Sequence, residues 1–326
     1  MTATGHFPRG GRSSLLFFIR WAVALLILGL LIYLLPLEPL RNAMARVPLT
    51  RLLIVLFIYL IALSVGIAKW HMVVNTAGAR LPFIVSARCY TSGLFGALFL
   101  PSIVGGDAAR LAVGIPRSSH PATLITGNLA DRFLDAAAQV TLIFIGLLLL
   151  PGSLPPQLQN LARRLLFIGG IVATLLLILA LLLYRPLLRG RSIRFRRVLA
   201  RLCCAMRSVS RRPHILVLGW LLGTSVQTTF LVLTALLGMS CGLYLPLRVW
   251  LIAWPLAKIA AILPFTQGGI GVREAALIAL LVPFGAPASL ALATGIVWEG
   301  IIIAGGLIAG LTAFLIHRLE SRATRA

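Results

Sequence analysis

Two stretches of this chain share a pattern of residues that could bind an anion. Residues 100–111 read LPSIVGGDAARL and residues 263–274 read LPFTQGGIGVRE, and both follow the frame Leu-Pro-x-x-x-Gly-Gly-x-x-x-Arg. A glycine pair lets the backbone open and turn its N–H groups toward an anion, as at a helix N-terminus, while an arginine neutralises the anion's charge. The glycines are Gly105, Gly106, Gly268, Gly269 and Gly271, and the arginines are Arg110 and Arg273.

Acidic residues are few and gather near these two frames. The chain has seven Asp and Glu residues, and five lie in or next to apolar stretches: Asp107, Asp131, Asp135, Glu274 and Glu299. Asp131 and Asp135 are four residues apart and share one helix face, with Arg132 between them in the sequence. Two acids on one face need a cation opposite, and Arg110 is the natural candidate.

Each half of the chain therefore supplies a glycine break, an arginine beyond it and an acid in the next long apolar stretch. That acid is Asp131 in the first half and Glu299 in the second, and Lys258 lies just before the second frame. These charges are typical of structural ion pairs and also of a site for a lipid phosphate, and the pattern leaves both open.

The composition places these charges in a membrane. The chain has 326 residues, of which 60% are hydrophobic and 11% charged, and its mean hydropathy is +1.01. A soluble domain of this length needs far more polar surface, so we interpret residues 1–326 as a single integral membrane domain. An uncompensated carboxylate at mid-bilayer costs about 2.5–3.5 kcal/mol, so the acids are expected to face the protein interior or a wet cavity.

The apolar stretches predict an all-α polytopic fold with eight hydrophobic segments. Two short segments, 87–100 and 248–263, each end at the proline of a frame and predict broken or re-entrant helical hairpins, with full spans as the alternative. Six others are long enough to cross the bilayer: 15–35, 50–68, 123–150, 165–184, 214–238 and 288–316.

A long span precedes and follows each hairpin, which is typical of inverted repeats around a site near the midplane. The alternative is two helix-breaking loops that are alike by accident. On the first interpretation the chain divides into five parts. They are an N-terminal anchor helix (1–49), a first repeat (50–150), a linking helix with a basic loop (151–213), a second repeat (214–316) and a tail (317–326).

The basic residues indicate orientation and partners. The chain carries 30 Lys and Arg residues and a formal net charge of +23. They lie mostly between apolar spans, so we expect anionic lipid headgroups rather than nucleic acid as partners. The loop at 185–212 has ten arginines and no acid, which predicts a cytoplasmic loop and two cytoplasmic termini in a bacterial plasma membrane. No cleavable signal peptide is evident.

Other chemistry is not indicated. The four cysteines have no CxxC or metal-like spacing, and the five histidines are scattered singly. No ATP-binding motif is present. We therefore expect no cofactor and no metal.

At these same residues the chain resembles a known family, the transmembrane region of lysylphosphatidylglycerol synthases, which includes stand-alone flippase-like proteins. The matching pieces are YTSGLFGALFLPSIVGGDAARL, NLADRFLDAA and LPFTQGGIGVREAALIALLVPFG, at 90–111, 128–137 and 263–285. The resemblance implies a lipid-handling domain that, in its best-understood members, moves aminoacylated phosphatidylglycerol between leaflets. The motif residues that carry over are Gly105, Gly106, Asp107, Arg110, Asp131, Arg132, Asp135, Gly268, Gly269, Gly271, Arg273 and Glu274.

Nothing after Ala326 could form the soluble aminoacyl-transferase domain of two-part members, so lipid synthesis is not expected. The favoured function is a lipid translocator for an anionic or aminoacylated phospholipid or a related lipid-linked headgroup. One alternative is a membrane-embedded transferase with Asp107, Asp131 or Glu299 as base. The other is an accessory subunit that scaffolds a lipid-biosynthetic enzyme in a glycolipid, hopanoid or lipid-modification pathway. An enzymatic activity is the less favoured reading.

Overall fold

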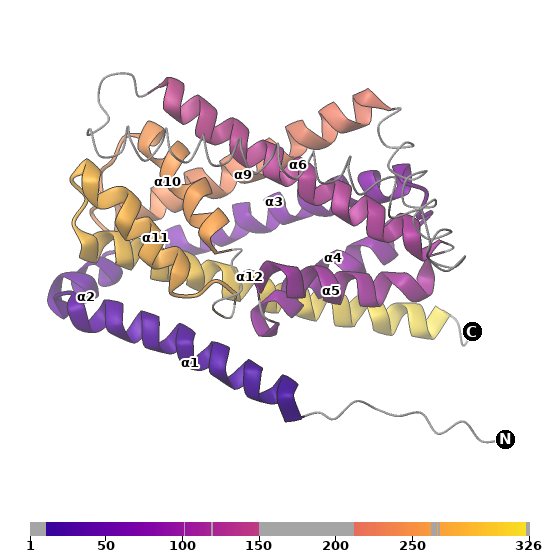
Figure 1. Cartoon of the computed structure of the whole chain (residues 1–326), viewed down its shortest axis with the longest axis horizontal. Helices are drawn as coiled ribbons and strands as arrows, with labels where there is room; N and C mark the ends of the chain where they lie inside the picture. Colours follow the sequence, from indigo (N-terminus) through magenta and orange to yellow (C-terminus); the bar gives the residue numbers. More distant parts are fainter. Residues whose placement is uncertain are drawn as a thin grey trace, which may run out of the picture.

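The structure is a computed structural model that describes residues 11–100, 102–118, 120–149, 212–261, 266 and 268–323. All regular structure within these residues is helical (Figure 1). The helices are α1 (Gly11–Leu34), α2 (Leu37–Ala45), α3 (Leu49–Thr76), α4 (Phe83–Phe99), α5 (Ser102–Gly114), η1 (Ile115–Arg117), α6 (Pro121–Leu148), α9 (Pro213–Ser240), α10 (Leu247–Ala260), α11 (Val272–Leu281), η3 (Val282–Phe284) and α12 (Ala288–Ala323).

Length and composition identify the membrane-crossing helices. Among the described residues, α3, α9 and α12 are long and apolar enough to span a membrane, and the bent pair α1–α2 is a fourth candidate. Helix α6 has 28 residues, which gives roughly 40 Å at 1.5 Å per residue, but it carries three charged side chains near its middle. The predicted all-helical membrane class is confirmed, while the count of six long spans stays a prediction.

The two hairpins, α4–α5 and α10–α11, enter the bundle from opposite ends (Figure 1). At one end, Arg51 at the start of α3 donates a hydrogen bond of 2.7 Å to Ser240 at the end of α9, just before α10 begins. At the other end, Arg88 near the start of α4 forms a 2.5 Å ion pair with Glu320 near the end of α12. These two contacts hold the hairpin entrances at opposite ends of the long helices.

The first hairpin breaks earlier than its glycines suggest. Leu100 ends α4 with extended backbone angles, and the proline that follows disfavours a helical conformation there. The sequence predicts an opened backbone at Gly105 and Gly106, and this prediction is wrong because both residues lie inside α5. They serve close packing instead, since a Cβ atom on Gly106 would lie 2.7 Å from the carbonyl oxygen of Gly93 on α4.

The second hairpin does have the predicted open backbone. Gly268, Gly269 and Gly271 have φ angles of 62°, 82° and 83°, in the left-handed region that other residues rarely adopt. They form the turns immediately before α11, so the same Gly-Gly frame adopts two different local structures. The second frame also has a third glycine, Gly271, where the first frame has Ala108 in α5.

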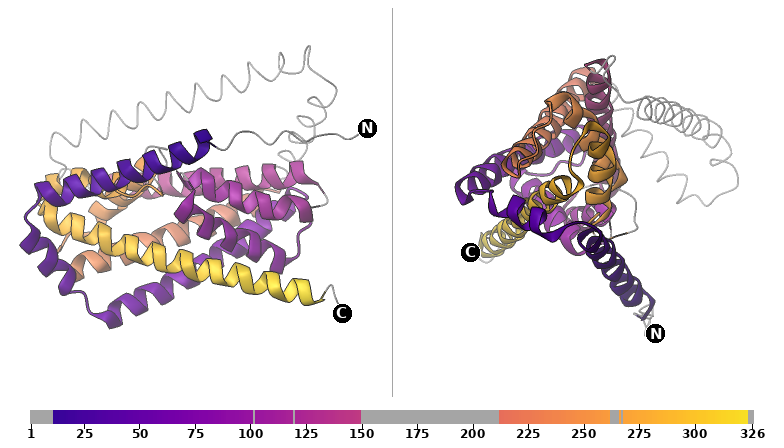
Figure 2. Two further views of the ribbon diagram at one scale, coloured as in Figure 1. Left: turned by 90° about the horizontal axis from the view of Figure 1, so that it is seen from below. Right: turned by 90° about the vertical axis from the view of Figure 1, so that its left-hand side faces the viewer.

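The N-terminal helices lie at the side of the bundle. Helices α1 and α2 meet at an angle of 104° around Pro36. Leu40 and Ala43 of α2 pack in a buried cluster with Leu292 and Ala293 of α12, and Leu28 of α1, which lies at the outer edge of the bundle, packs against the same cluster (Figure 2). Helix α1 begins toward the end of the bundle at which α12 stops (Figure 1). The cytoplasmic assignment of that end stays a prediction.

The long helices interlock the two halves of the chain. Helix α3 packs beside α9, α4 packs against α12, and α10 packs against α6. The first helix of each hairpin therefore packs against the last long helix of the other half. The largest buried cluster includes Tyr59, Trp250, Trp254 and Trp298, which come from α3, α10 and α12. The predicted span at 165–184 and nearly all of the basic loop at 185–212 lie outside the described residues.

Candidate functional site

Lys69 is the centre of a buried charge cluster that α3 and α6 build together. Its Nζ atom lies 2.8 Å from Asp131 Oδ1 and 2.5 Å from Asp135 Oδ1. The side chains of Lys69 and Asp131 are 3% and 0% exposed. The two carboxylates share a face of α6, and the ammonium between them offsets their repulsion. The sequence predicts Arg110 as the partner of these acids, but Lys69 is the closer cation.

Arg110 reaches the same cluster from α5. Its Nη1 atom lies 3.7 Å from Asp107 Oδ1 and 3.8 Å from Asp131 Oδ2. Its guanidinium carbon is 4.1 Å from the centroid of the Tyr90 ring, which is a cation–π geometry. The same Nη1 atom is 3.5 Å from Asn128 Oδ1, the limit of a hydrogen bond. Arg110 is thus held between a ring of α4 and the acids of α5 and α6.

Arg132 is the third cation of the cluster. Its guanidinium nitrogens lie 3.3 Å from Asp107 Oδ2, 3.5 Å from Asp131 Oδ2 and 3.6 Å from Asp135 Oδ2. These separations are longer than those of strong charge-assisted hydrogen bonds. In the described part of the chain, Asp131 Oδ2 and the Nε atoms of Arg110 and Arg132 are buried without a hydrogen-bond partner. The cluster balances three cations against three acids but leaves some of its polar atoms unsatisfied.

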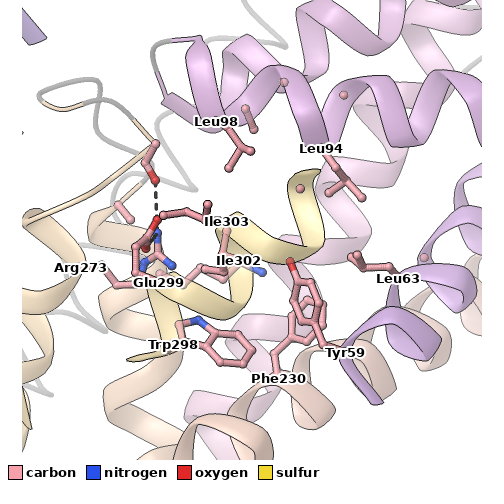
Figure 3. Close-up of a pocket in the computed structure, with 18 of the residues that line it drawn as sticks. Tyr59, Leu63, Leu94, Leu98, Phe230, Arg273, Trp298, Glu299, Ile302 and Ile303 are labelled. Atoms are coloured by element: carbon pink, nitrogen blue, oxygen red, sulfur yellow. Dashed lines mark hydrogen bonds and ion pairs between the residues drawn. The ribbon is translucent and has the colours of Figure 1, made fainter. Parts of the chain in front are cut away.

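The second half supplies a smaller ion pair. Arg273 Nη2 lies 3.2 Å from Glu299 Oε2 and donates a hydrogen bond of 3.2 Å to the carbonyl oxygen of Gly268 (Figure 3). The arginine of the second frame is therefore held both by the acid of the next long helix and by its own glycine turn. Arg110 and Asp131 occupy the corresponding positions of the first half, at the longer distance of 3.8 Å.

Glu274 has a structural position. Its Oε2 atom accepts a 2.6 Å hydrogen bond from the backbone N–H of Gly271, which precedes α11. A carboxylate at this place caps the helix and opposes the positive end of its dipole. The sequence places Glu274 in the substrate site, but its side chain is 1% exposed and satisfies the turn instead.

A cavity of about 350 Å³ lies where the two hairpins approach each other, and Figure 3 shows part of its lining. Residues of both hairpins and of α3, α6, α9 and α12 surround it. Five basic side chains and three acidic ones contribute to its wall. The basic ones are Lys69, Arg110, Arg132, Lys258 and Arg273, and the acidic ones are Asp107, Asp135 and Glu299.

Lys258 differs from the other four cations of the cavity. Its Nζ atom donates a 2.7 Å hydrogen bond to Gln227 Oε1 and lies 5.1 Å from the ring centroid of Trp254 and 5.7 Å from that of Phe230. Within the described residues, no carboxylate oxygen lies within 4 Å of this ammonium, whereas each other basic residue of the wall pairs with an acid.

The cavity has an apolar mouth near the hairpin tips. Phe99 at the end of α4 and Ile303 and Leu307 on α12 line it and are 46%, 41% and 51% exposed. Large apolar side chains that are both cavity-lining and exposed face lipid in a membrane-spanning bundle. Polar atoms at the centre and apolar side chains at the mouth match the two ends of an amphipathic ligand.

The structure divides the sequence-predicted site residues into two groups. Those that line the cavity are Gly106, Asp107, Arg110, Arg132, Asp135, Lys258, Gly268, Arg273 and Glu299. Those that support it from behind are Gly105, Asp131, Gly269, Gly271 and Glu274, which shape the hairpins or hold the lining cations.

Sequence reasoning missed several residues of this wall. Lys69 lies just beyond the predicted span at 50–68, while α3 continues to Thr76. The sequence did contain a sign that Lys69 is special, because Lys69 and Lys258 are the only lysines in the chain. The aromatic part of the wall gave no signal, because Tyr59, Phe230 and Trp298 read as ordinary residues of apolar spans.

The fold and the cavity define a multi-pass helical membrane protein with a charged internal site open toward lipid. Comparison with known families then places the chain more closely. The model of the family described as the lysylphosphatidylglycerol synthase TM region matches residues 17–310, so the chain belongs to this family. No curated protein matches the chain. The family supports a membrane protein of the lipid-modification or flippase kind.

Proposed function

We propose that this protein moves a phospholipid with an anionic or aminoacylated headgroup between the two leaflets of a bacterial plasma membrane. The observation that carries the proposal is the cavity between the hairpins, which combines five basic side chains with an apolar mouth. A lipid headgroup that enters there exchanges its hydration for fixed charges of the protein. The acyl chains of the same lipid stay among the exposed side chains of α4 and α12. This lowers the cost of carrying a phosphate through the hydrocarbon region.

The dimensions of the cavity support this assignment. Ligand pockets commonly have volumes of about 300–1,000 Å³, so a cavity of about 350 Å³ is at the small end of that range. It suits a glycerophosphate headgroup better than a whole lipid with two acyl chains. The tails would therefore remain outside throughout the passage, and only the polar part would cross inside the protein.

We further propose that the two halves act as inverted repeats that open the cavity to each leaflet in turn. The hairpins enter from opposite ends of the bundle, and each packs against a long helix of the other half. Movement of one hairpin relative to its partner helix would open the cavity toward one leaflet only. This is the arrangement by which many transporters alternate access around a fixed site. The termini would then both face the cytoplasm.

Translocation of headgroup-labelled phospholipids in proteoliposomes tests the function. Wild-type protein is expected to move an anionic lipid faster than protein-free vesicles do, and Arg110→Ala and Glu299→Gln are expected to abolish the movement. Zwitterionic, anionic and lysyl-modified lipids, measured in parallel, rank the substrates. Size-exclusion chromatography establishes that each variant is folded. If folded wild-type protein moves none of these lipids, stand-alone translocation is contradicted.

A further inference from the structure

We propose that Lys258 binds the phosphate of the translocated lipid, and that the cavity prefers a headgroup with one net negative charge over a zwitterionic or cationic one. This inference rests on the proposed function and makes it more specific. It concerns a charge that the described protein residues leave uncompensated and that lies in a cavity of suitable size.

Charge balance singles out this lysine. The cluster around α6 contains three cations and three acids within ion-pair distance of one another. Arg273 is paired with Glu299, and Glu274 is bonded to the backbone at the start of α11. Lys258 is left without a carboxylate in the described part of the chain. An isolated cation away from water is costly, so the site is completed by an anionic ligand.

The surroundings of Lys258 suit a site that is emptied and refilled. Its partner in the structure is a neutral amide, Gln227 Oε1, so one of the three ammonium N–H groups is used and two remain available to a phosphate. The ring centroids of Trp254 and Phe230 lie 5.1 Å and 5.7 Å from the same ammonium, and these rings exclude water from it. A lower local dielectric strengthens the attraction of the ammonium for an anion.

Tyr59 supplies a neutral donor to the same cavity. Its ring packs 5.0 Å from that of Phe230, which Lys258 also contacts, and its hydroxyl is directed toward the cavity (Figure 3). Among the described residues this hydroxyl has no hydrogen-bond partner. A phosphodiester between Lys258 and Tyr59 would receive one charged and one neutral hydrogen bond without disturbing any ion pair of the protein.

The use of lysine at this position is itself informative. The chain has 30 Lys and Arg residues, of which only Lys69 and Lys258 are lysines. Both line the cavity, and arginine serves everywhere else. Lysine presents a compact charge with freely rotating donors, whereas arginine makes planar, two-pronged pairs with carboxylates. A compact charge holds a phosphate without the fixed orientation that would slow its release.

The same charge balance sets the preference between headgroups. A headgroup amine needs a carboxylate, but each of the acids in the cavity wall is within 4 Å of a basic side chain. An added amine would have to displace one of these cations. A headgroup whose remaining groups are hydroxyls requires no displacement, so phosphatidylglycerol is expected to bind more tightly than phosphatidylethanolamine or lysyl-phosphatidylglycerol.

Two substitutions test the proposal in different ways. Lys258→Gln removes the charge, and Gln227→Glu keeps Lys258 but gives it a carboxylate partner in place of the amide. Both are expected to weaken binding of dioctanoyl-phosphatidylglycerol about tenfold or more, as expected for loss of a charge-assisted hydrogen bond. Lys258→Arg restores part of the binding that Lys258→Gln loses. Arg51→Gln, at the end of the bundle and outside the cavity, is the control.

Binding is measured by native mass spectrometry of purified protein with dioctanoyl-phosphatidylglycerol, phosphatidylethanolamine and lysyl-phosphatidylglycerol. Folding is checked by thermal unfolding, which Gln227→Glu should not impair because it strengthens the contact with Lys258. If Gln227→Glu binds phosphatidylglycerol as tightly as wild type does, the Lys258 site is overturned while translocation stands. If binding depends on Lys258 but no lipid crosses the bilayer in proteoliposomes, the translocator is overturned and the anion site stands.

Discussion

Replacing Lys69 with methionine removes the central cation of the α3–α6 cluster while keeping a side chain of similar length. In the structure the Lys69 ammonium lies 2.8 Å from Asp131 and 2.5 Å from Asp135. Its loss leaves two neighbouring carboxylates facing each other on one turn of α6. We expect the variant to be strongly destabilised, because the two acids then repel each other in a poorly hydrated site.

The size of this effect follows from burial and from the remaining cations. Breaking a buried ion pair by removing one partner typically costs about 3–5 kcal/mol. Asp131 is fully buried, but Asp135 is 20% exposed and Arg132 lies 3.6 Å from it. Because of these compensations, we expect Lys69→Met to lower the free energy of unfolding by about 3 kcal/mol, near the lower end of this range. The double variant Lys69→Met/Asp131→Asn removes the like-charge contact and should recover part of the loss.

Unfolding in mild detergent, followed by circular dichroism against temperature or denaturant, measures these differences. Arg51→Gln is the matched control, because it removes a cation whose contact in the structure is a hydrogen bond to Ser240. Loss of this hydrogen bond is expected to lower the free energy of unfolding by about 1 kcal/mol. If Lys69→Met is no less stable than this control, the ammonium does not hold the cluster together. If Asp131→Asn fails to rescue Lys69→Met, repulsion between the acids is not the cause of the loss.

Two further predictions concern the hairpin contact and the mouth of the cavity. Gly106→Ala places a Cβ atom 2.7 Å from the backbone oxygen of Gly93, so it should destabilise the protein by about 1–3 kcal/mol in the same unfolding assay. Gly300→Ala, which meets nothing within 4 Å, should not destabilise it. Leu307→Trp narrows the apolar mouth and should slow lipid translocation with little loss of stability. Leu315→Trp, on an exposed part of α12 outside the cavity wall, should leave the translocation rate unchanged. Equal translocation rates for the two tryptophan variants would contradict the assignment of the mouth.

The sequence predicts the fold class and the chemistry of the site because both depend on local patterns. Apolar length identifies the spanning helices, and the Leu-Pro step identifies the break of the first hairpin. Acids in apolar stretches must be compensated, so their presence alone predicts a charged interior site. The pairing of Arg273 with Glu299 follows from the same reasoning and is present in the structure.

What the sequence does not predict depends on contacts between distant segments. Lys69 and Asp135 are 66 residues apart, and only the packing of α3 against α6 brings them together. The different conformations of the two Gly-Gly pairs follow from tertiary packing, because Gly106 has to fit against Gly93 whereas Gly268 begins an open turn. The contacts of Lys258 also require the assembled bundle, since Gln227 reaches it from another helix.

The central claim is that the headgroup passes between the two hairpins, and a reversible cross-link between their tips tests it most directly. A Cβ atom on Gly268 would lie 3.6 Å from the backbone oxygen of Ala97, so cysteines at these two positions lie on either side of the hairpin contact, within reach of a short cross-linker. In a variant whose four native cysteines are replaced, a short bifunctional methanethiosulfonate would join them without changing any charge of the site. The account predicts that translocation falls to the protein-free rate when the hairpins are joined and returns when reductant cleaves the link. Unchanged translocation by fully cross-linked protein would contradict it.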